Sequence, residues 1–392
     1  VYRPVRVRKE DGRFILTSYL AFEDAGKLLD CRYEICDLNG VISEGTLEFS
    51  VQPMGSTELT IDGTANNTFI NFYFTAKSDT LWCEKGYPVC FEQVMLTEIK
   101  SAQSADSGEE PVLTETPLSF VVTMGDVTYT IDRRRGCISS IRKGADELIG
   151  KPMEFNFFRA PTDNDRGWNM PKVCKAWRLA TESGKMPDRC EASLAVDRTA
   201  DGKYLVGLKV KIDGKQLPVP RIGVSFKIPR SLVNVEWHGY GPWENYSDRR
   251  VSAQLGRWRA KVDLVSGIAG GDGKISYADD RLNPDNYSEP GEQGYRTGCR
   301  WISFSDGGGA KVKITALNAP VGFNAWPYTQ EELERAKHQW DLSKGDSITV
   351  NVDAAMMGVG GDDSWGARAH ADDMIAEGEY NLRFLVEGLE HD

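Results

Sequence analysis

The sequence is poor in several features that define common classes of protein. It contains no apolar run near the roughly 20 residues that a membrane-spanning helix needs, and its mean hydropathy is -0.42. Positive charge is also in deficit, because 47 Lys and Arg stand against 58 Asp and Glu and give a net charge of -11. Binding to phosphate backbones depends on clustered Lys and Arg. We therefore expect a soluble protein with neither a membrane nor a nucleic-acid partner. Its compartment, cytoplasm or periplasm, stays open.

Histidine is scarce, and cysteine lacks a functional pattern. None of the His residues has the HxH or HExxH spacing of a zinc site; they are His238, His338, His370 and His391. The eight Cys residues lack the two-residue spacing of a zinc knuckle or redox motif, which favours core thiols in a reducing compartment. A disulfide between Cys83 and Cys90 is the alternative. A G-x-S-x-G elbow is missing as well, so a serine hydrolase is not supported.

What the sequence does contain is a pattern of short β-strands. Alternating or β-rich runs such as residues 14–20, 31–36 and 57–61 are separated by turn signals, for example Asp62-Gly63. Seven or so such runs in the first 100 residues are typical of an immunoglobulin-like sandwich. We therefore predict an all-β protein whose first domain spans residues 1–100.

A change of composition then separates this domain from a larger one. Residues 101–117 are rich in Ser, Glu, Thr and Pro and predict a linker, because they can bury little apolar surface. Strand patterns resume and continue to the end, and residues 118–392 are too many for an ordinary seven-stranded sandwich. They predict a large sandwich of two sheets. Thr329 and Glu332 form a capping-box pattern that predicts one short helix within it.

Two polar segments have both a functional and a structural interpretation. The oxygens of Asp163-Asn164-Asp165 could converge on a cation or a sugar, or they could satisfy local backbone N–H groups while Arg159 pairs with a carboxylate. The Gly and Glu of an EF-hand loop are missing, which favours the second interpretation. Residues 237–249 place several aromatic residues beside a Gly-Pro turn. They could stack on a sugar, although packing of a loop against the core is the favoured interpretation.

A third segment, residues 358–365, combines three glycines with Asp362, Asp363 and a terminal Trp365. Glycine permits sharp turns, so such a loop can present an indole to a ligand rather than bury it. A presented indole is a natural platform for a sugar, but a single Trp can equally belong to a core. The residues alone leave both interpretations open.

Five ordered segments resemble the C-terminal β-sandwich of glycoside hydrolase family 2 β-galactosidases. These five motif segments are FRAPTDNDRG at 158–167, GYGPWENYSDR at 239–249, GEQGYRTGCRW at 291–301, FNAWPYTQEEL at 323–333 and MGVGGDDSW at 357–365. The N-terminal part, which opens VYRPV, resembles the immunoglobulin-like domain that follows the catalytic barrel in that family. The resemblance covers nearly the whole chain. One departure is GEQG at 291–294, where the family usually reads P-Q-E-N-G.

The resemblance implies a non-catalytic portion of an enzyme that hydrolyses terminal β-D-galactosides. Its larger domain would have the supersandwich fold of galactose mutarotases, and Trp365, with Asp362 and Asp363 beside it, would contact the sugar. Tyr328 and His338 would give structural support. The catalytic glutamates and the magnesium ligands would lie in a barrel outside this chain, so we carry over no catalytic residue, metal ligand or cofactor. Implied partners are the galactoside, the barrel domain and other copies of the parent.

Two alternatives to an excised portion stay open. The chain could be a natural small subunit that associates with a separate barrel-bearing subunit. It could also be a stand-alone mutarotase or carbohydrate-binding protein, although a mutarotase needs an acid/base pair such as His with Glu facing one pocket. The chain opens on Val1 without Met or a signal peptide, which we interpret as a trimmed or mature fragment.

Overall fold

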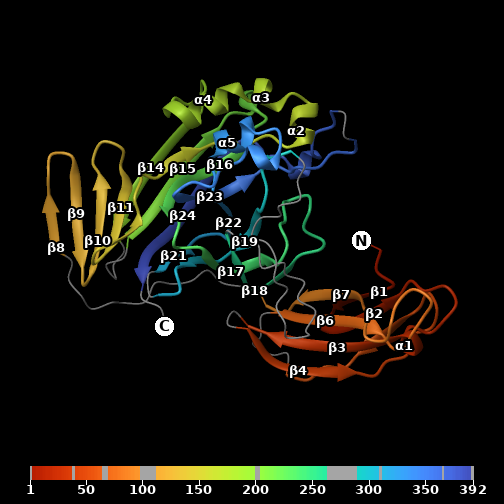
Figure 1. Ribbon diagram of the computed structural model, residues 1–392. Helices are drawn as coiled ribbons and strands as arrows, with labels where there is room; N and C mark the ends of the chain where they lie inside the picture. The colour runs from red at the N-terminus through yellow and green to blue at the C-terminus, as the bar shows by residue number, and fades with distance from the viewer. Residues whose placement is uncertain are drawn as a thin grey trace. The chain divides into compact units, whose positions relative to one another are not determined.

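The computed structural model describes residues 2–37, 40–63, 69–97, 112–198, 204–262, 289–308, 311–363 and 366–389. These residues form an all-β protein, which confirms the fold class expected from the alternating pattern. The chain divides into two compact units, Val1–Lys100 and Ser101–Asp392. Both are drawn in Figure 1.

Unit 1 is a sandwich of a three-stranded and a four-stranded sheet, so the described residues contain the seven strands expected. The first sheet has the order β1 (Val5–Glu10), β2 (Arg13–Ser18), β5 (Ser56–Leu59), and the second β4 (Val41–Leu47), β3 (Leu29–Cys36), β6 (Phe69–Ala76), β7 (Pro88–Met95). A single turn of helix, α1 (Ala25–Leu28), precedes β3. The inward residues of the two sheets meet in one core, where the rings of Phe14 and Phe72 lie 5.9 Å apart. Cys83 and Cys90 are free thiols, so the disulfide alternative is wrong.

Unit 2 is built on a larger sandwich of two sheets, as predicted. The five-stranded sheet has the order β13 (Glu154–Asn156), β16 (Arg221–Pro229), β23 (Ser347–Met356), β22 (Val321–Trp326), β19 (Arg296–Cys299). The seven-stranded sheet has the order β14 (Glu191–Arg198), β15 (Tyr204–Ile212), β24 (Gly378–Leu389), β21 (Lys311–Ala316), β20 (Trp301–Ser305), β17 (Asn234–Gly241), β18 (Gln254–Lys261). Phe323 of the first sheet packs against Trp237 and Phe304 of the second, at ring distances of 5.9 and 6.4 Å. The core of unit 2 therefore lies between these two sheets.

A further sheet packs beside the larger one and corrects the predicted linker. It consists of β8 (Val112–Glu115), β9 (Ser119–Met124), β10 (Val127–Asp132), β11 (Cys137–Lys143) and β12 (Asp146–Ile149), and Figure 1 shows its strands next to β14. Residues 112–115 of the predicted linker 101–117 are thus an edge strand. All four side chains of β8 are exposed, and the strand pairs with β9 through its backbone. Amino-acid composition indicates how much apolar surface the side chains of a segment can bury. It therefore does not reveal a strand such as β8, whose side chains are all exposed.

Short helices lie mainly at the edge of the five-stranded sheet. They are α2 (Asp163–Gly167), α3 (Met170–Val173), α4 (Lys175–Ser183) and α5 (Gln330–Arg335), with 3-10 turns at Gly214–Gln216, Gln339–Asp341 and Ala371–Asp373. The capping box of Thr329 and Glu332 opens α5, which confirms the predicted helix. No helix in the described part of the chain is long and apolar enough to cross a membrane.

Candidate functional site

The site centres on residues 357–363, which we call the glycine loop and which end two residues before Trp365, the predicted platform residue. Its first two residues are held by Arg159, whose side chain is completely buried. Nη1 of Arg159 donates to the carbonyl oxygen of Met357 at 2.6 Å, and Nη2 donates to that of Gly358 at 2.9 Å. The same guanidinium binds both carboxylate oxygens of Asp165 at 2.9 Å. Arg159 therefore ties the motif segment 158–167 to the start of the glycine loop.

The next two residues of the loop are held by side chains from two other places. Asn164 donates through Nδ2 to the carbonyl oxygen of Val359 at 3.0 Å, and the N–H of Gly360 donates to Oδ2 of Asp248 at 2.6 Å. Asp248 lies so close that a Cβ on Gly358 would sit 2.5 Å from its Oδ2. Four successive residues of the loop are thus fixed by three side chains, and glycine is needed where Asp248 approaches.

The acidic segment 163–165 has the structural role that its sequence favoured. Asp165 pairs with Arg159 and also accepts from the N–H of Thr162 at 3.1 Å, while its own N–H donates to the Thr162 hydroxyl at 3.2 Å. This reciprocal capping box opens α2. Among the described residues, no group of three or more His, Cys, Asp or Glu side chains is placed to hold a metal ion.

The aromatic segment 237–249 mostly packs into the core, as expected. Trp237 and Tyr246 are buried, and the ring of Tyr246 stacks on Tyr295 at 5.5 Å. Trp243 is the exception, with its side chain partly exposed. Asn245 holds the turn together, because its Nδ2 donates to two carbonyl oxygens of the segment and its Oδ1 accepts from the N–H of Thr297 at 3.0 Å.

A cavity of about 290 Å³ lies beside the glycine loop. Its lining comes from four of the five motif segments and from residue 289: Thr162, Asp163, Asn164, Tyr246, Arg249, Glu289, Gly291, Glu292 and Val359. The remaining segment, 323–333, reaches the same place through Asn324, which donates to Oε1 of Glu292. Segments up to about 200 residues apart in the chain, such as those of Arg159 and Gly358, therefore converge on one region of unit 2.

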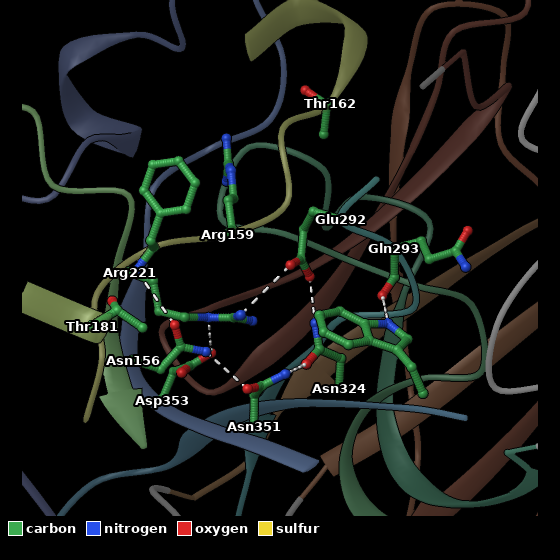
Figure 2. A network of polar contacts seen from close by, with 12 residues as sticks. Asn156, Arg159, Thr162, Thr181, Arg221, Glu292, Gln293, Asn324, Asn351 and Asp353 are labelled. Atoms are coloured by element: carbon green, nitrogen blue, oxygen red, sulfur yellow. Dashed lines mark hydrogen bonds and ion pairs between the residues drawn. The ribbon is translucent and has the colours of Figure 1, made fainter. Parts of the chain in front are cut away.

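Below the cavity, Glu292 belongs to a buried polar network (Figure 2). Its carboxylate points away from Thr162, toward Asn324 and Arg221, whose Nη1 lies 3.6 Å from Oε2. Nε of Arg221 donates to Asp353 at 3.0 Å. Burial disfavours the charged carboxylate and raises the pKa of Glu292 to about 7, although Arg221 opposes the shift. Burial likewise raises the pKa of Asp353 to about 6.

The predicted contact residues lie at the far side of the loop. Trp365 lies outside the described residues, and Asp362 is exposed, with its Oδ1 2.8 Å from Nε2 of His370. Asp363 accepts from the N–H groups of Gly366 and Ala367, both at 3.1 Å. The carboxylates of Asp362 and Asp363 thus hold the two sides of the turn together. A sugar-binding role for Trp365, Asp362 and Asp363 stays a prediction.

Several residues that shape the site were not identified from the sequence. No sequence pattern identifies Asp248 or Glu292. Asp248 shapes the site by its contacts with Gly358 and Gly360, and Glu292 by its burial beside Arg221. Tyr328 packs against the small core around Trp326 and so gives the structural support expected of it. His338, by contrast, is exposed and stacks on Trp340 at 4.4 Å, outside any core.

Comparison with known proteins points to the same segments. The family described as "Beta galactosidase small chain" matches residues 123–266 and 280–386, and "Beta-galactosidase, domain 4" matches residues 14–97. The β-galactosidase of Priestia megaterium is 29% identical over 87% of this chain and 34% of its own length. That of Actinobacillus pleuropneumoniae is 27% identical over 98% of this chain and 39% of its own.

The chain therefore spans little more than a third of the length of these curated relatives. A solved structure described as a possible aldose 1-epimerase of Escherichia coli K12 aligns with 72% of this chain and 100% of its own, at 10% identity and a TM-score of 0.33. That likeness is too weak to support an argument. The small-chain family matches well over half of the residues, and the chain accordingly belongs to the β-galactosidase small-chain family.

Proposed function

We propose that this chain is a non-catalytic portion of a β-galactosidase and that its glycine loop completes the sugar pocket of a catalytic barrel outside this chain. The observation that carries the proposal is the fixation of residues 357–360 by Arg159, Asn164 and Asp248. A binding residue contributes most when its supporting shell holds it in the productive geometry. A loop that is held at four successive backbone positions is suited to presenting Trp365, which follows five residues after Gly360.

In this proposal, Trp365 stacks its indole on the apolar face of the sugar or the leaving group. An aromatic platform of this kind combines burial of apolar surface with a preferred stacking geometry. Asp362 pairs with His370 through Oδ1, but its carboxylate is exposed and its other oxygen can accept hydrogen bonds from sugar hydroxyls, whereas Asp363 already accepts two backbone N–H groups. We therefore assign Asp363 to holding the turn and Asp362 to the rim of the pocket.

The bond-breaking groups belong, in this proposal, to the barrel. Hydrolysis of a glycoside requires two carboxyl groups on opposite sides of the scissile bond, and the barrel would supply both of them together with the magnesium ion. Among the described residues, the carboxyl groups of Glu292 and Asp353 have pKa values raised by burial, and both are fully buried within the network of Arg221. They hold the fold beneath the cavity and take no part in proton transfer to the substrate.

Reconstitution tests the proposal. The chain alone should not hydrolyse 2-nitrophenyl β-D-galactoside, and addition of the barrel-bearing remainder of the parent should produce turnover. With Trp365→Ala in the chain, the KM of the reconstituted enzyme should rise roughly tenfold, equivalent to about 1.4 kcal/mol of lost binding. Trp340→Ala is the matched control, because this exposed Trp lies on a different loop.

Two results would contradict the proposal. Turnover by the highly purified chain alone would show that it carries its own catalytic groups. An unchanged KM in Trp365→Ala would show that the indole does not contact the substrate. The reading frame upstream of Val1 distinguishes the two organisations, because a start codon there indicates a natural small subunit and an open frame that encodes a barrel indicates an excised portion.

A further inference from the structure

One end of the unit 1 sandwich exposes a group of large apolar side chains. They lie on the loops of residues 19–28, 52–55 and 77–87, which we call the end face: Phe22, Leu28, Met54, Leu81, Trp82 and Tyr87. Phe22 is 92% exposed and Trp82 is 66% exposed. Large exposed apolar patches are uncommon on monomeric proteins and mark sites of interaction.

Backbone hydrogen bonds bring the three loops of the end face together. The N–H of Met54 donates to the carbonyl oxygen of Leu20 at 3.0 Å, and the N–H of Lys77 donates to that of Leu28 at 2.9 Å. Nζ of Lys77 also donates to the carbonyl oxygen of Gly26 at 3.0 Å. Within the third loop, the rings of Trp82 and Tyr87 meet edge to face at 5.6 Å. Hydrogen bonds therefore join the three loops of the end face at one end of the sandwich.

The point at which the chain enters unit 1 indicates which neighbouring segment joins the sandwich beside the end face. Pro4 accepts from the N–H of Tyr19 at 2.8 Å, so the chain enters the sandwich beside the end face. The last strand, β7, begins at this end with Pro88 and runs to Met95, which pairs with Phe69 at the opposite end. The strand β7 thus ends at the end of the sandwich opposite the end face. Any polypeptide that precedes Tyr2 joins unit 1 next to these apolar side chains.

We propose that the end face docks the domain that precedes unit 1 in a longer β-galactosidase polypeptide, with Leu81 and Trp82 as its anchors. The matched family is named domain 4, and the chain spans only 34% of one such relative, so most of the parent lies outside it. Covalent attachment beside the face gives the preceding domain a high effective concentration there. Trp is a frequent anchor of protein interfaces. This inference rests on the proposed association with a catalytic portion.

Hydrogen exchange provides the first test. Amides of residues 77–87 should exchange at least tenfold more slowly in the full-length parent than in this chain alone, while those of β4, whose Val41 and Ile42 are also exposed, should exchange equally in both. Equal exchange of residues 77–87 in the two proteins would overturn the inference.

A pair of variants provides the second test. Leu81→Ser with Trp82→Ser should leave the thermal midpoint of the isolated chain unchanged and lower that of the full-length parent. When the two parts are mixed as separate polypeptides, the same change should weaken their binding at least ~30-fold. The matched control, Val41→Ser with Ile42→Ser, should change neither value.

Two outcomes separate this inference from its alternatives. If the isolated chain dimerises and the Leu81/Trp82 change dissociates the dimer, the end face is a contact between copies and the inference is wrong. The effect of Trp365→Ala on KM is measured in the same full-length enzyme and reports only on the sugar pocket. Failure of one proposal is therefore visible without failure of the other.

Discussion

Replacement of Arg159 by Met should destabilise unit 2 more than any change to a surface arginine. The side chain is completely buried, and its guanidinium makes two hydrogen bonds to Asp165 and one each to Met357 and Gly358. Met keeps an unbranched apolar stem but has no donor, so the buried carboxylate of Asp165 and two carbonyl oxygens lose the hydrogen bonds of the guanidinium. Removal of one partner from a buried ion pair costs about 3–5 kcal/mol.

The loss can be converted into a change of melting temperature. A unit of about 290 residues has an unfolding entropy of roughly 0.6 kcal/mol/K, so 3–5 kcal/mol corresponds to a decrease of about 5–8 °C. Differential scanning calorimetry of the whole chain measures it. Arg135→Met is the matched control, because Arg135 pairs with Glu154 on the surface, where a pair contributes about 0–1 kcal/mol. A decrease in Arg159→Met no larger than that of Arg135→Met would refute the reasoning.

Two further predictions concern the buried network and the glycine loop. The pKa of Glu292 is about 7 in the folded protein, above its ordinary value of 4.5, so the native state binds the proton more tightly and the free energy of unfolding should fall as pH rises from 4.5 through 7. Glu292 accounts for about 3 kcal/mol of this loss. Urea denaturation at pH 5 and pH 8 should show a larger fall in the free energy of unfolding in the unmodified chain than in Glu292→Gln, where the smaller contribution of Asp353, whose pKa is about 6, remains. An equal fall in the two proteins would contradict the raised pKa of Glu292. Gly358→Ala places a Cβ 2.5 Å from Oδ2 of Asp248 and 2.8 Å from the Cβ of Ala369 and should cost about 1–3 kcal/mol, part of it recovered in Gly358→Ala with Asp248→Ala. Gly345→Ala, where a Cβ meets nothing closer than 3.7 Å, is the control, and equal costs at the two glycines would show that Asp248 is not the obstacle.

Periodicity was sufficient to predict the fold because many strands of both sandwiches, such as β2 and β21, bury alternate side chains, although β22 is buried along its whole length. The helix α5 could also be predicted from the sequence, because Thr329 and Glu332 form a capping box of the usual composition. The same motif opens α2 with Asp165 in place of Glu or Gln, and five residues are too few to show helical periodicity, so the sequence did not predict this helix. β8 was missed because its pairing with β9 uses only the backbone.

The site was less accessible to sequence reasoning than the fold. The aromatic segment 237–249 and the Asp165 pair follow local rules, and both behave as expected. The hydrogen bonds that hold the glycine loop do not follow local rules, because Arg159 donates to a carbonyl oxygen 198 residues away and Asp248 accepts from Gly360 across 112 residues. Glu292 looks like any surface carboxylate in the sequence, and only the tertiary structure places it beside Arg221 and Asn324.

We expect the side chains that hold the glycine loop, such as Asp248, to affect the substrate by positioning Trp365. A double-mutant cycle of kcat/KM in the complete enzyme tests it with Asp248→Ala and Trp365→Ala. Asp248→Ala removes a charge-assisted hydrogen bond to Gly360 and should lower kcat/KM roughly tenfold by loosening the platform. In the Trp365→Ala background the same change should have less than about a twofold effect, because no platform remains to be positioned. Effects that multiply independently would contradict this expectation.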